Sequence, residues 1–208
     1  MTVATPPVTT PPEVNPHYTP GAEKLLAAAS ELFYREGIHA VGVDAIAAAA
    51  GVTKKTLYDR FGSKEALAVA YLRGRDARWR EHLERELALQ PPGSVERILA
   101  VFDVSGRWAI SDSSKGCSAI NARAEMDDSA HPIALEAIRQ KKWMREVFAR
   151  LCQEAAVRDT DRVANTLMLL YEGALVTVGM ETFADPFAVG RAAAAAILAA
   201  AAILAAAV

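Results

Sequence analysis

Residues 43–64 read VDAIAAAAGVTKKTLYDRFGSK, and this stretch is the most informative part of the chain. Its first eight residues carry apolar side chains at the i, i+3, i+4, i+7 spacing of a buried helical stripe: Val43, Ile46, Ala47 and Ala50. Gly51 follows, and glycine readily adopts the positive φ that ends a helix and turns the chain. The pattern therefore predicts a short helix over residues 43–50 that ends in a tight turn.

A second short helix is predicted over residues 54–61. Thr53 is a suitable N-cap, because a threonine hydroxyl can accept a hydrogen bond from the first helical turn. Burial of Leu57 and Phe61 would leave the side chains near the start of this helix largely exposed: Thr53, Lys54, Lys55, Thr56 and Tyr58. Such donor-rich side chains reach base edges and phosphates when a helix enters the major groove of DNA. The two helices therefore indicate a helix-turn-helix.

The surrounding sequence extends this motif into a family resemblance. Residues 24–67, KLLAAASELFYREGIHAVGVDAIAAAAGVTKKTLYDRFGSKEAL, resemble the N-terminal domain of the TetR family of transcriptional repressors. The matching residues are Ala29, Leu32, Phe33, Gly37, Ile46, Ala47, Ala50, Gly51, Val52, Thr56, Leu57, Tyr58, Phe61 and Lys64. The sequence departs from the family at Gly42, where Ser or Thr is usual, and at Arg60, where an aromatic residue or His is more usual.

The resemblance implies roles for the residues around the second helix. Tyr58 and Lys64 match family positions that commonly contact phosphate. Thr53, Lys55 and Thr56 match positions that read bases or contact the adjacent backbone. The candidate DNA-binding residues are therefore Thr53, Lys54, Lys55, Thr56, Tyr58 and Lys64.

The composition favours an all-α fold with a local DNA-binding surface. Hydrophobic residues make up 52% of the chain, alanine is abundant, and no run of alternating β-branched residues stands out. The net charge is −2, so contacts to DNA have to come from a local basic patch. Two cysteines make no disulfide framework, and the N-terminus lacks the pattern of a signal peptide, so a cytoplasmic location is expected.

Helical periodicity and helix-breaking residues predict about nine helices. The predicted ranges are 21–36, 43–50, 54–61, 64–89, 94–110, 118–127, 132–156, 161–182 and 187–207. The resemblance implies that three of these helices bind DNA and that the others form an antiparallel regulatory bundle. We therefore expect a disordered Pro/Thr-rich arm (1–19), a helix-turn-helix DNA-binding domain (20–65) and a ligand-binding and dimerisation bundle (66–208).

The last predicted helix suggests a subunit interface. Residues 192–208 are uncharged and consist mainly of alanine, so this helix has no polar face and should be buried. A membrane anchor is an alternative because the length is close to that of a membrane span. Alanine is only weakly apolar, however, and a two-fold homodimer is favoured. The partner helix would be 161–182, with Leu167, Leu170, Ala174, Val178 and Glu181.

The resemblance also implies an effector pocket in the bundle. The segment KGCSAINARAEM at 115–126 resembles a TetR subgroup with Gly-Cys, Asn and Glu at this spacing. Asn121 and Glu125 share a helix face, where they would either bind an effector or brace the helix against its neighbours. The candidate pocket residues are Phe102, Trp108, Cys117, Asn121, Glu125, Trp143, Phe148, Tyr171 and Glu172. The expected effector is small and largely apolar, with one or two polar groups.

Several alternatives stay open around Cys117. The thiol could sense oxidants if it were exposed and readily ionised. A loose group of possible metal ligands (Cys117, Glu125, Asp127, Asp128 and His131) shows no recurrent ligand spacing. Cys117 with His131 could form a nucleophile–base pair, but the chain contains no catalytic motif that would support an enzyme.

The sequence as a whole predicts a homodimeric, ligand-responsive regulator that binds double-stranded DNA at a near-palindromic operator. A repressor is favoured, and an activator stays open because the sign of regulation depends on where the operator lies. An adaptor that uses the helix-turn-helix to bind protein is a further alternative, which the exposed basic face disfavours. No cofactor, metal or enzymatic activity is predicted.

Overall fold

The structure is a computed structural model that describes residues 18–112, 115–182 and 184–206. Those ranges contain nine helices and no strand: α1 (Pro20–Glu36), α2 (Val43–Ala50), α3 (Lys54–Phe61), α4 (Lys64–Leu87), α5 (Val95–Asp112), α6 (Ser118–Ala124), α7 (Pro132–Glu154), α8 (Thr160–Thr177) and α9 (Pro186–Ala206). The predicted all-α fold is confirmed. Most of the predicted arm, residues 1–17, lies outside the described residues.

Local sequence signals explain where the first helices begin and end. Pro20 occupies the first turn of α1, where its missing N–H costs nothing. Gly51 ends α2 in the left-handed conformation, with φ of 64°, as predicted. The Thr53 hydroxyl accepts a hydrogen bond from the backbone N–H of Thr56, and Ser63 caps α4 in the same way through Ala66. The helix-turn-helix is therefore encoded by short-range interactions.

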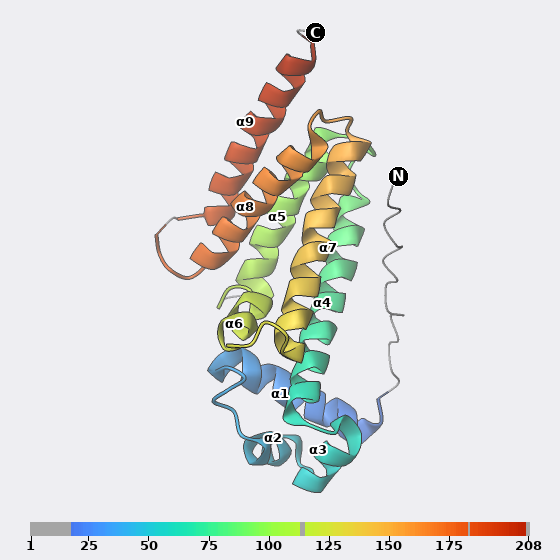
Figure 1. The fold of residues 1–208 in the computed structure, drawn as a ribbon, viewed down its shortest axis with the longest axis vertical. Coiled ribbons are helices and arrows are strands. Elements are labelled where there is room, and N and C mark those ends of the chain that lie inside the picture. The colour runs from blue at the N-terminus through green and yellow to red at the C-terminus, as the bar shows by residue number, and fades with distance from the viewer. Residues whose placement is uncertain (1–17, 113–114, 183, 207–208) are drawn as a thin grey trace, which may run out of the picture.

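The molecule is elongated, with α1, α2 and α3 gathered at one end (Figure 1). The longer helices α4, α5, α7, α8 and α9 form the bundle, and α4 runs from the helix-turn-helix end into it (Figure 1). The short helix α6 packs on α7 and lies next to α1 (Figure 1). Both α4 and α6 therefore connect the bundle to the helix-turn-helix end.

Two hydrophobic cores divide the molecule. The N-terminal core is built on buried residues of α1–α3 and their loops, among them Leu25, Phe33, Ile46 and Leu57. It also includes Leu67, Tyr71 and Leu72 from α4, Ala122 from α6 and Ile133 from α7. The second core fills the bundle and takes Leu83 and Leu87 from the far end of α4. Helix α4 is thus shared by both cores. The predicted boundary at residue 65 between a DNA-binding domain and a bundle stays a proposal.

The last helix, α9, packs one side against α5 and α8. Phe187, Ala194 and Leu198 on that side are buried. Two glycines permit the close approach: a Cβ at Gly190 would lie 3.2 Å from the ring of Phe102, and one at Gly106 would lie 3.2 Å from Phe187. The other side of α9 exposes Val189, Ala192 and Ala196. Among the described helices, none is long and apolar enough to cross a membrane.

The predictions for α8 were wrong in two respects. The helix ends at Thr177 instead of residue 182, because Val178 leaves the helical conformation and Gly179 has a φ of 76°. Leu167 and Ala174, expected at a subunit interface, are buried in the protomer's own core. The exposed face of α8 instead carries Leu169, Gly173 and Val176. Sequence periodicity identified the apolar side of the helix, but it could not show whether the protomer's own core or a second subunit covers that side.

Candidate nucleic-acid interface and effector pocket

The helix α3 presents its polar side to solvent on an apolar anchor. Leu57 is fully buried between α1, α2 and α4, whereas the Tyr58 side chain is 45% exposed. Lys54 and Lys55 are exposed, and Thr56 is half-buried near the start of α1. The arrangement gives a rigid helix whose first turns project polar groups, as a recognition helix requires.

The threonines at the start of α3 hold each other in place. The hydroxyls of Thr53 and Thr56 lie 2.9 Å apart, and the Thr53 hydroxyl also accepts the Thr56 N–H at 3.2 Å. These contacts fix the first turn before any DNA is present. A base or phosphate contact by either residue would therefore use the remaining hydrogen-bonding capacity of its hydroxyl.

Both exposed lysines of α3 form ion pairs. The Lys54 ammonium lies 3.2 Å from a carboxylate oxygen of Asp44, and the Lys55 ammonium lies 2.7 Å from Asp59. Exposed pairs of this kind contribute little free energy and exchange readily with other anions. The Asp44 pairing was missed from the sequence, although an acidic residue in the first turn of α2 was a visible signal.

Two side chains, those of Lys64 and Glu125, hold the loop between α1 and α2. The Lys64 ammonium donates to the backbone carbonyl of His39 at 3.3 Å. The Glu125 carboxylate, just beyond α6, accepts the backbone N–H groups of Ile38 at 3.0 Å and His39 at 2.5 Å. This loop leads directly into the helix-turn-helix, so α6 contacts the element that positions α2.

The hollow that contains Asn121 and Glu125 lies between α1 and α6. Its volume is about 190 Å³, and it is also lined by residues of α1 and by Lys115. The Asn121 amide donates to the backbone carbonyl of Lys115 at 3.0 Å. The two side chains therefore share one site, as their spacing predicted, and the partners that they have there are backbone groups of neighbouring elements.

Three of the predicted pocket residues meet inside the bundle. Trp108, Cys117 and Tyr171 line a hollow of about 70 Å³ between α4, α5, α7 and α8. The ring of Trp108 lies 5.5 Å from that of Trp79, centroid to centroid, and closes one side. A space of this size holds only a few water molecules.

The other predicted aromatic residues lie away from this hollow. Phe102 and Phe148 are fully buried, with ring centroids 5.9 Å apart, and both pack on Tyr171. Trp143 receives the guanidinium of Arg80 over its ring at 4.1 Å. Aromatic side chains contribute large buried areas, and these three lie in or against the core of the bundle.

Cys117 and Glu172 meet at a lysine that sequence reasoning missed. The Lys141 ammonium lies 3.2 Å from the Cys117 sulfur and 2.8 Å from a carboxylate oxygen of Glu172. Burial alone lowers the pKa of Lys141, but Cys117 and Glu172 outweigh it and leave that pKa above its ordinary value. Lys141 therefore stays charged, and no signal in the sequence linked α7 to these two positions.

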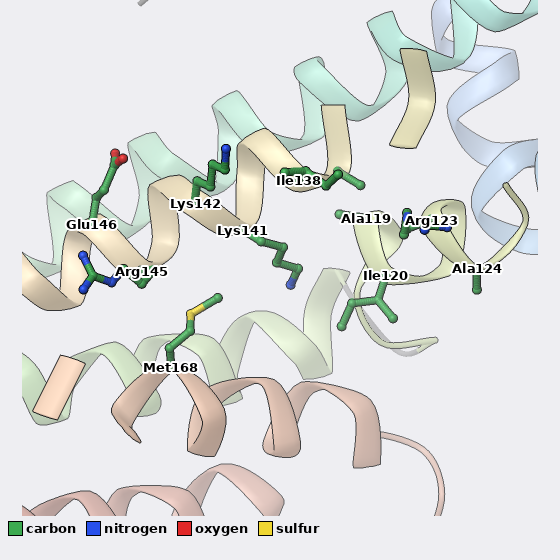
Figure 2. A pocket seen from close by; sticks show the side chains of 11 residues that line it. Ala119, Ile120, Arg123, Ala124, Ile138, Lys141, Lys142, Arg145, Glu146 and Met168 are labelled. Atoms are coloured by element: carbon green, nitrogen blue, oxygen red, sulfur yellow. The ribbon is translucent and has the colours of Figure 1, made fainter. Parts of the chain in front are cut away.

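A third hollow, larger than the two described above, lies between α6, α7 and α8. This groove has a volume of about 750 Å³ (Figure 2). Ile120 from α6, Lys141 from α7 and Met168 from α8 point into it (Figure 2). None of the predicted pocket residues lines it. The groove was hard to predict from the sequence, because its apolar lining residues are mostly alanine and isoleucine and its walls belong to three separate helices.

His131, the residue on which the metal and enzyme alternatives depend, caps a helix. His131 caps α7, where its ring nitrogen accepts the backbone N–H of Ile133 at 3.3 Å. No group of three or more described His, Cys, Asp or Glu side chains could hold a metal ion. This contact gives the His131 ring a structural role at the start of α7.

The exposed, capped helix α3 on a three-helix support defines a helix-turn-helix transcriptional regulator. The family profile described as "Bacterial regulatory proteins, tetR family" matches residues 25–71. The crystal structure of a putative TetR transcriptional regulator (sav143) from Streptomyces avermitilis is 30% identical, over 85% of this chain and 98% of that one, with a TM-score of 0.68. The chain belongs to the TetR family, which confirms the resemblance.

Two further transcriptional regulators are similar to this chain, one over most of its length and one over a short segment. SCO4454, a TetR-family transcriptional regulator from Streptomyces coelicolor, is 29% identical over 86% of this chain and 96% of that one, with a TM-score of 0.78. The HTH-type transcriptional activator FasR of Mycolicibacterium smegmatis is 53% identical over 49 residues. That match spans 24% of this chain and only 22% of the relative.

Proposed function

We propose that the protein is a homodimeric repressor that binds a near-palindromic operator and is released from it by a small effector. The observation that carries this proposal is the exposed polar side of α3, held rigid by the buried Leu57 and the Thr53 cap. In this proposal Thr53, Lys55 and Thr56 contact bases or the adjacent backbone, and Tyr58 and Lys64 contact phosphates. Lys54 adds a positive charge beside them.

The surface ion pairs of Lys54 and Lys55 support these roles, because DNA phosphates could take the place of the carboxylates. Lys54 and Lys55 each hold a surface carboxylate that a DNA phosphate would replace. Because such pairs are weak in water, the exchange costs little, and release of counterions from DNA favours it. Arg60 is exposed on the same helix and adds to the local positive charge.

A single helix-turn-helix makes too few contacts for specificity, so the protein should act as a two-fold dimer. The exposed apolar side chains of α8 and α9 lie where such an interface would form: Leu169, Val176 and Val189, with Gly173, Ala192 and Ala196 between them. Leu169 is 74% exposed in the single chain. Covering this surface with its symmetry mate would remove apolar area from water.

The effector response would act through the spacing of the two recognition helices. Two half-sites one DNA turn apart require a separation of about 34 Å. Helix α4 packs in both cores, so a shift of the bundle moves the helix-turn-helix. The effector must bind the DNA-free state more tightly, and DNA must weaken effector binding by the same factor. Equal effector affinity with and without operator would contradict this coupling.

The experiment that tests the proposal is a footprint on the DNA upstream of the protein's own gene, at two salt concentrations with excess competitor DNA. Wild type should protect a near-palindrome, Lys55→Ala should lose that protection, and Arg85→Ala, an exposed change at the far end of α4, should retain it. Weak, sequence-independent protection would contradict specific recognition. A protected site that increases transcription would assign an activator, as the FasR relative is named.

Thiol sensing through Cys117 is a second candidate, favoured by the Lys141 ammonium 3.2 Å from its sulfur. The ammonium donates a hydrogen bond to this sulfur, and the Cys117 side chain is only half-buried. Operator binding before and after treatment with hydrogen peroxide tests it. Sensing requires that peroxide releases wild type and Cys152→Ser but leaves Cys117→Ser bound.

A further inference from the structure

The groove between α6, α7 and α8 has the size and lining of a ligand site. Its volume of about 750 Å³ falls within the range of about 300–1,000 Å³ that small-molecule sites occupy. The hollow inside the bundle is about ten times smaller. We propose that this groove binds an anionic amphiphile, an apolar chain that ends in a carboxylate, and that this molecule is the effector. The inference rests on the proposed function.

The apolar part of the groove suits a hydrocarbon chain. Ala119 and Ile120 form the α6 wall, Ala137 and Ile138 form the α7 wall, and Met168 closes the α8 side. Ile120 and Met168 point into the space between the helices (Figure 2). Methionine adapts its shape to an irregular apolar ligand. Binding of such a chain would remove the apolar surface of the groove from water, which favours the complex.

The charges of the groove favour an anion. Its lining contains four basic side chains and one acidic side chain, although the whole chain is slightly acidic. Lys141 and Arg145 are paired with Glu172 and Asp161. Among the described residues, no acid pairs with Arg123, whose guanidinium donates to the carbonyl of Met126, or with Lys142. The groove lining therefore contains two positive charges, Arg123 and Lys142, that no described acid pairs with.

A ligand in the groove would change the contacts that hold the DNA-binding end. Helix α6 supplies one wall, and Glu125, directly after that helix, holds the backbone N–H groups of Ile38 and His39. A chain that enters between α6 and α7 displaces α6 and with it the Glu125 carboxylate. The loop that leads into α2 then loses one of its two supports.

Calorimetric titration of the full-length protein with dodecanoate, without DNA, tests the site directly. Wild type should bind saturably, while dodecanol and dodecylamine should bind more weakly because they lack the negative charge. The double charge reversal Arg123→Glu/Lys142→Glu should weaken dodecanoate binding by about tenfold or more. Arg85→Glu, a reversal of an exposed cation outside the groove, should leave it unchanged.

A second variant tests the apolar wall. Ile138 is half-buried, and Ile138→Trp should fill the groove and abolish dodecanoate binding while the far-ultraviolet circular dichroism stays that of wild type. Absence of saturable binding to wild type, or equal binding by the double reversal, would overturn the proposal. A change of oligomeric state in Ile138→Trp without dodecanoate binding to wild type would assign the groove to a second copy and would also overturn it. Operator binding is measured separately, so failure of the DNA-binding proposal remains distinguishable.

Discussion

The carboxylate of Glu125 accepts the backbone N–H of Ile38 at 3.0 Å, which joins the end of α6 to the loop that precedes the helix-turn-helix. The same carboxylate accepts the N–H of His39. Hydrogen bonds to a charged acceptor are stronger than those between neutral groups. Helix α6 therefore provides a second connection between the bundle and the DNA-binding end, beside the continuous helix α4.

We expect Glu125→Gln to weaken the coupling between effector and operator. An amide offers one acceptor oxygen in place of two and carries no charge, so the loop is held less tightly. The ratio of operator Kd values with and without dodecanoate should fall severalfold, at a stability cost of about 1–3 kcal/mol. Asp127→Asn, an exposed change two residues away, is the control. A ratio equal to that of wild type would contradict a role of Glu125 in coupling.

Lys64→Ala should weaken binding to every DNA sequence. The ammonium lies beside the α1–α2 loop, and its proposed contact is to phosphate, which carries no base information. The slope of log K against log salt should become shallower by about one. The measurement is a salt titration of operator and random DNA, with Arg85→Ala as control. An unchanged slope would show that Lys64 makes no phosphate contact.

Leu57→Ala should destabilise the DNA-binding end. The side chain is fully buried beneath α3, so its truncation leaves a cavity that costs about 2–5 kcal/mol. Urea unfolding followed by circular dichroism measures the loss. Tyr58→Phe removes only a hydroxyl from a half-exposed ring, and its unfolding curve should match that of wild type. Equal curves for both variants would mean that Leu57 does not anchor α3.

The interface of α4 and α7 contains two buried carboxylates, Asp76 and Glu136, whose ion pairs should make stability depend on pH. Arg139 donates to Glu136 at 2.7 Å and to Asp76 at 2.8 Å, and Arg73 lies 3.1 Å from Glu136. Burial raises the pKa of Glu136, but hydrogen bonds from Arg139 and Gln140 and the charge of Arg139 outweigh it. That pKa therefore lies below its ordinary value of 4.5.

The sign of the pH effect follows from this lowered pKa. A carboxyl that is more acidic in the folded state stabilises the fold above its ordinary pKa of 4.5, and this contribution is lost as pH falls through the lowered value. Glu136→Gln should be less stable at pH 7 and should lose less stability on acidification. Urea unfolding between pH 7 and 3 measures both, with the exposed Glu96→Gln as control. Parallel curves for Glu136→Gln and wild type would contradict the prediction.

The two cysteines should react at very different rates. Cys152 is fully buried, and burial raises its pKa to about 11, so it is hardly ionised at pH 8. Cys117 is half-buried beside Lys141. A thiol reagent should modify one cysteine in the native protein and both after denaturation. Native Cys117→Ser should not react, and modification of Cys152 in that variant would contradict the assignment.

The number and order of the described helices, the helix-turn-helix and the family could all be predicted from the sequence. Gly51, Thr53 and Ser63 each act within a few residues of their own position, so their effects can be recognised without knowing the rest of the fold. Periodicity likewise marked apolar faces, and Leu57 and Ile46 are buried as predicted. Helix ends were less certain where no cap was visible, as at the end of α8.

The contacts of each apolar or polar helix face depend on how the helices pack together, so they could not be predicted from local sequence. Leu167 turned inward and Leu169 outward because the packing of α8 on α7 and α9 sets its rotation, which no local signal encodes. The meeting of Lys141 with Cys117 and Glu172 joins three elements that are distant in sequence. The groove arises in the same way, since its walls belong to three helices whose spacing depends on side chains elsewhere in the core.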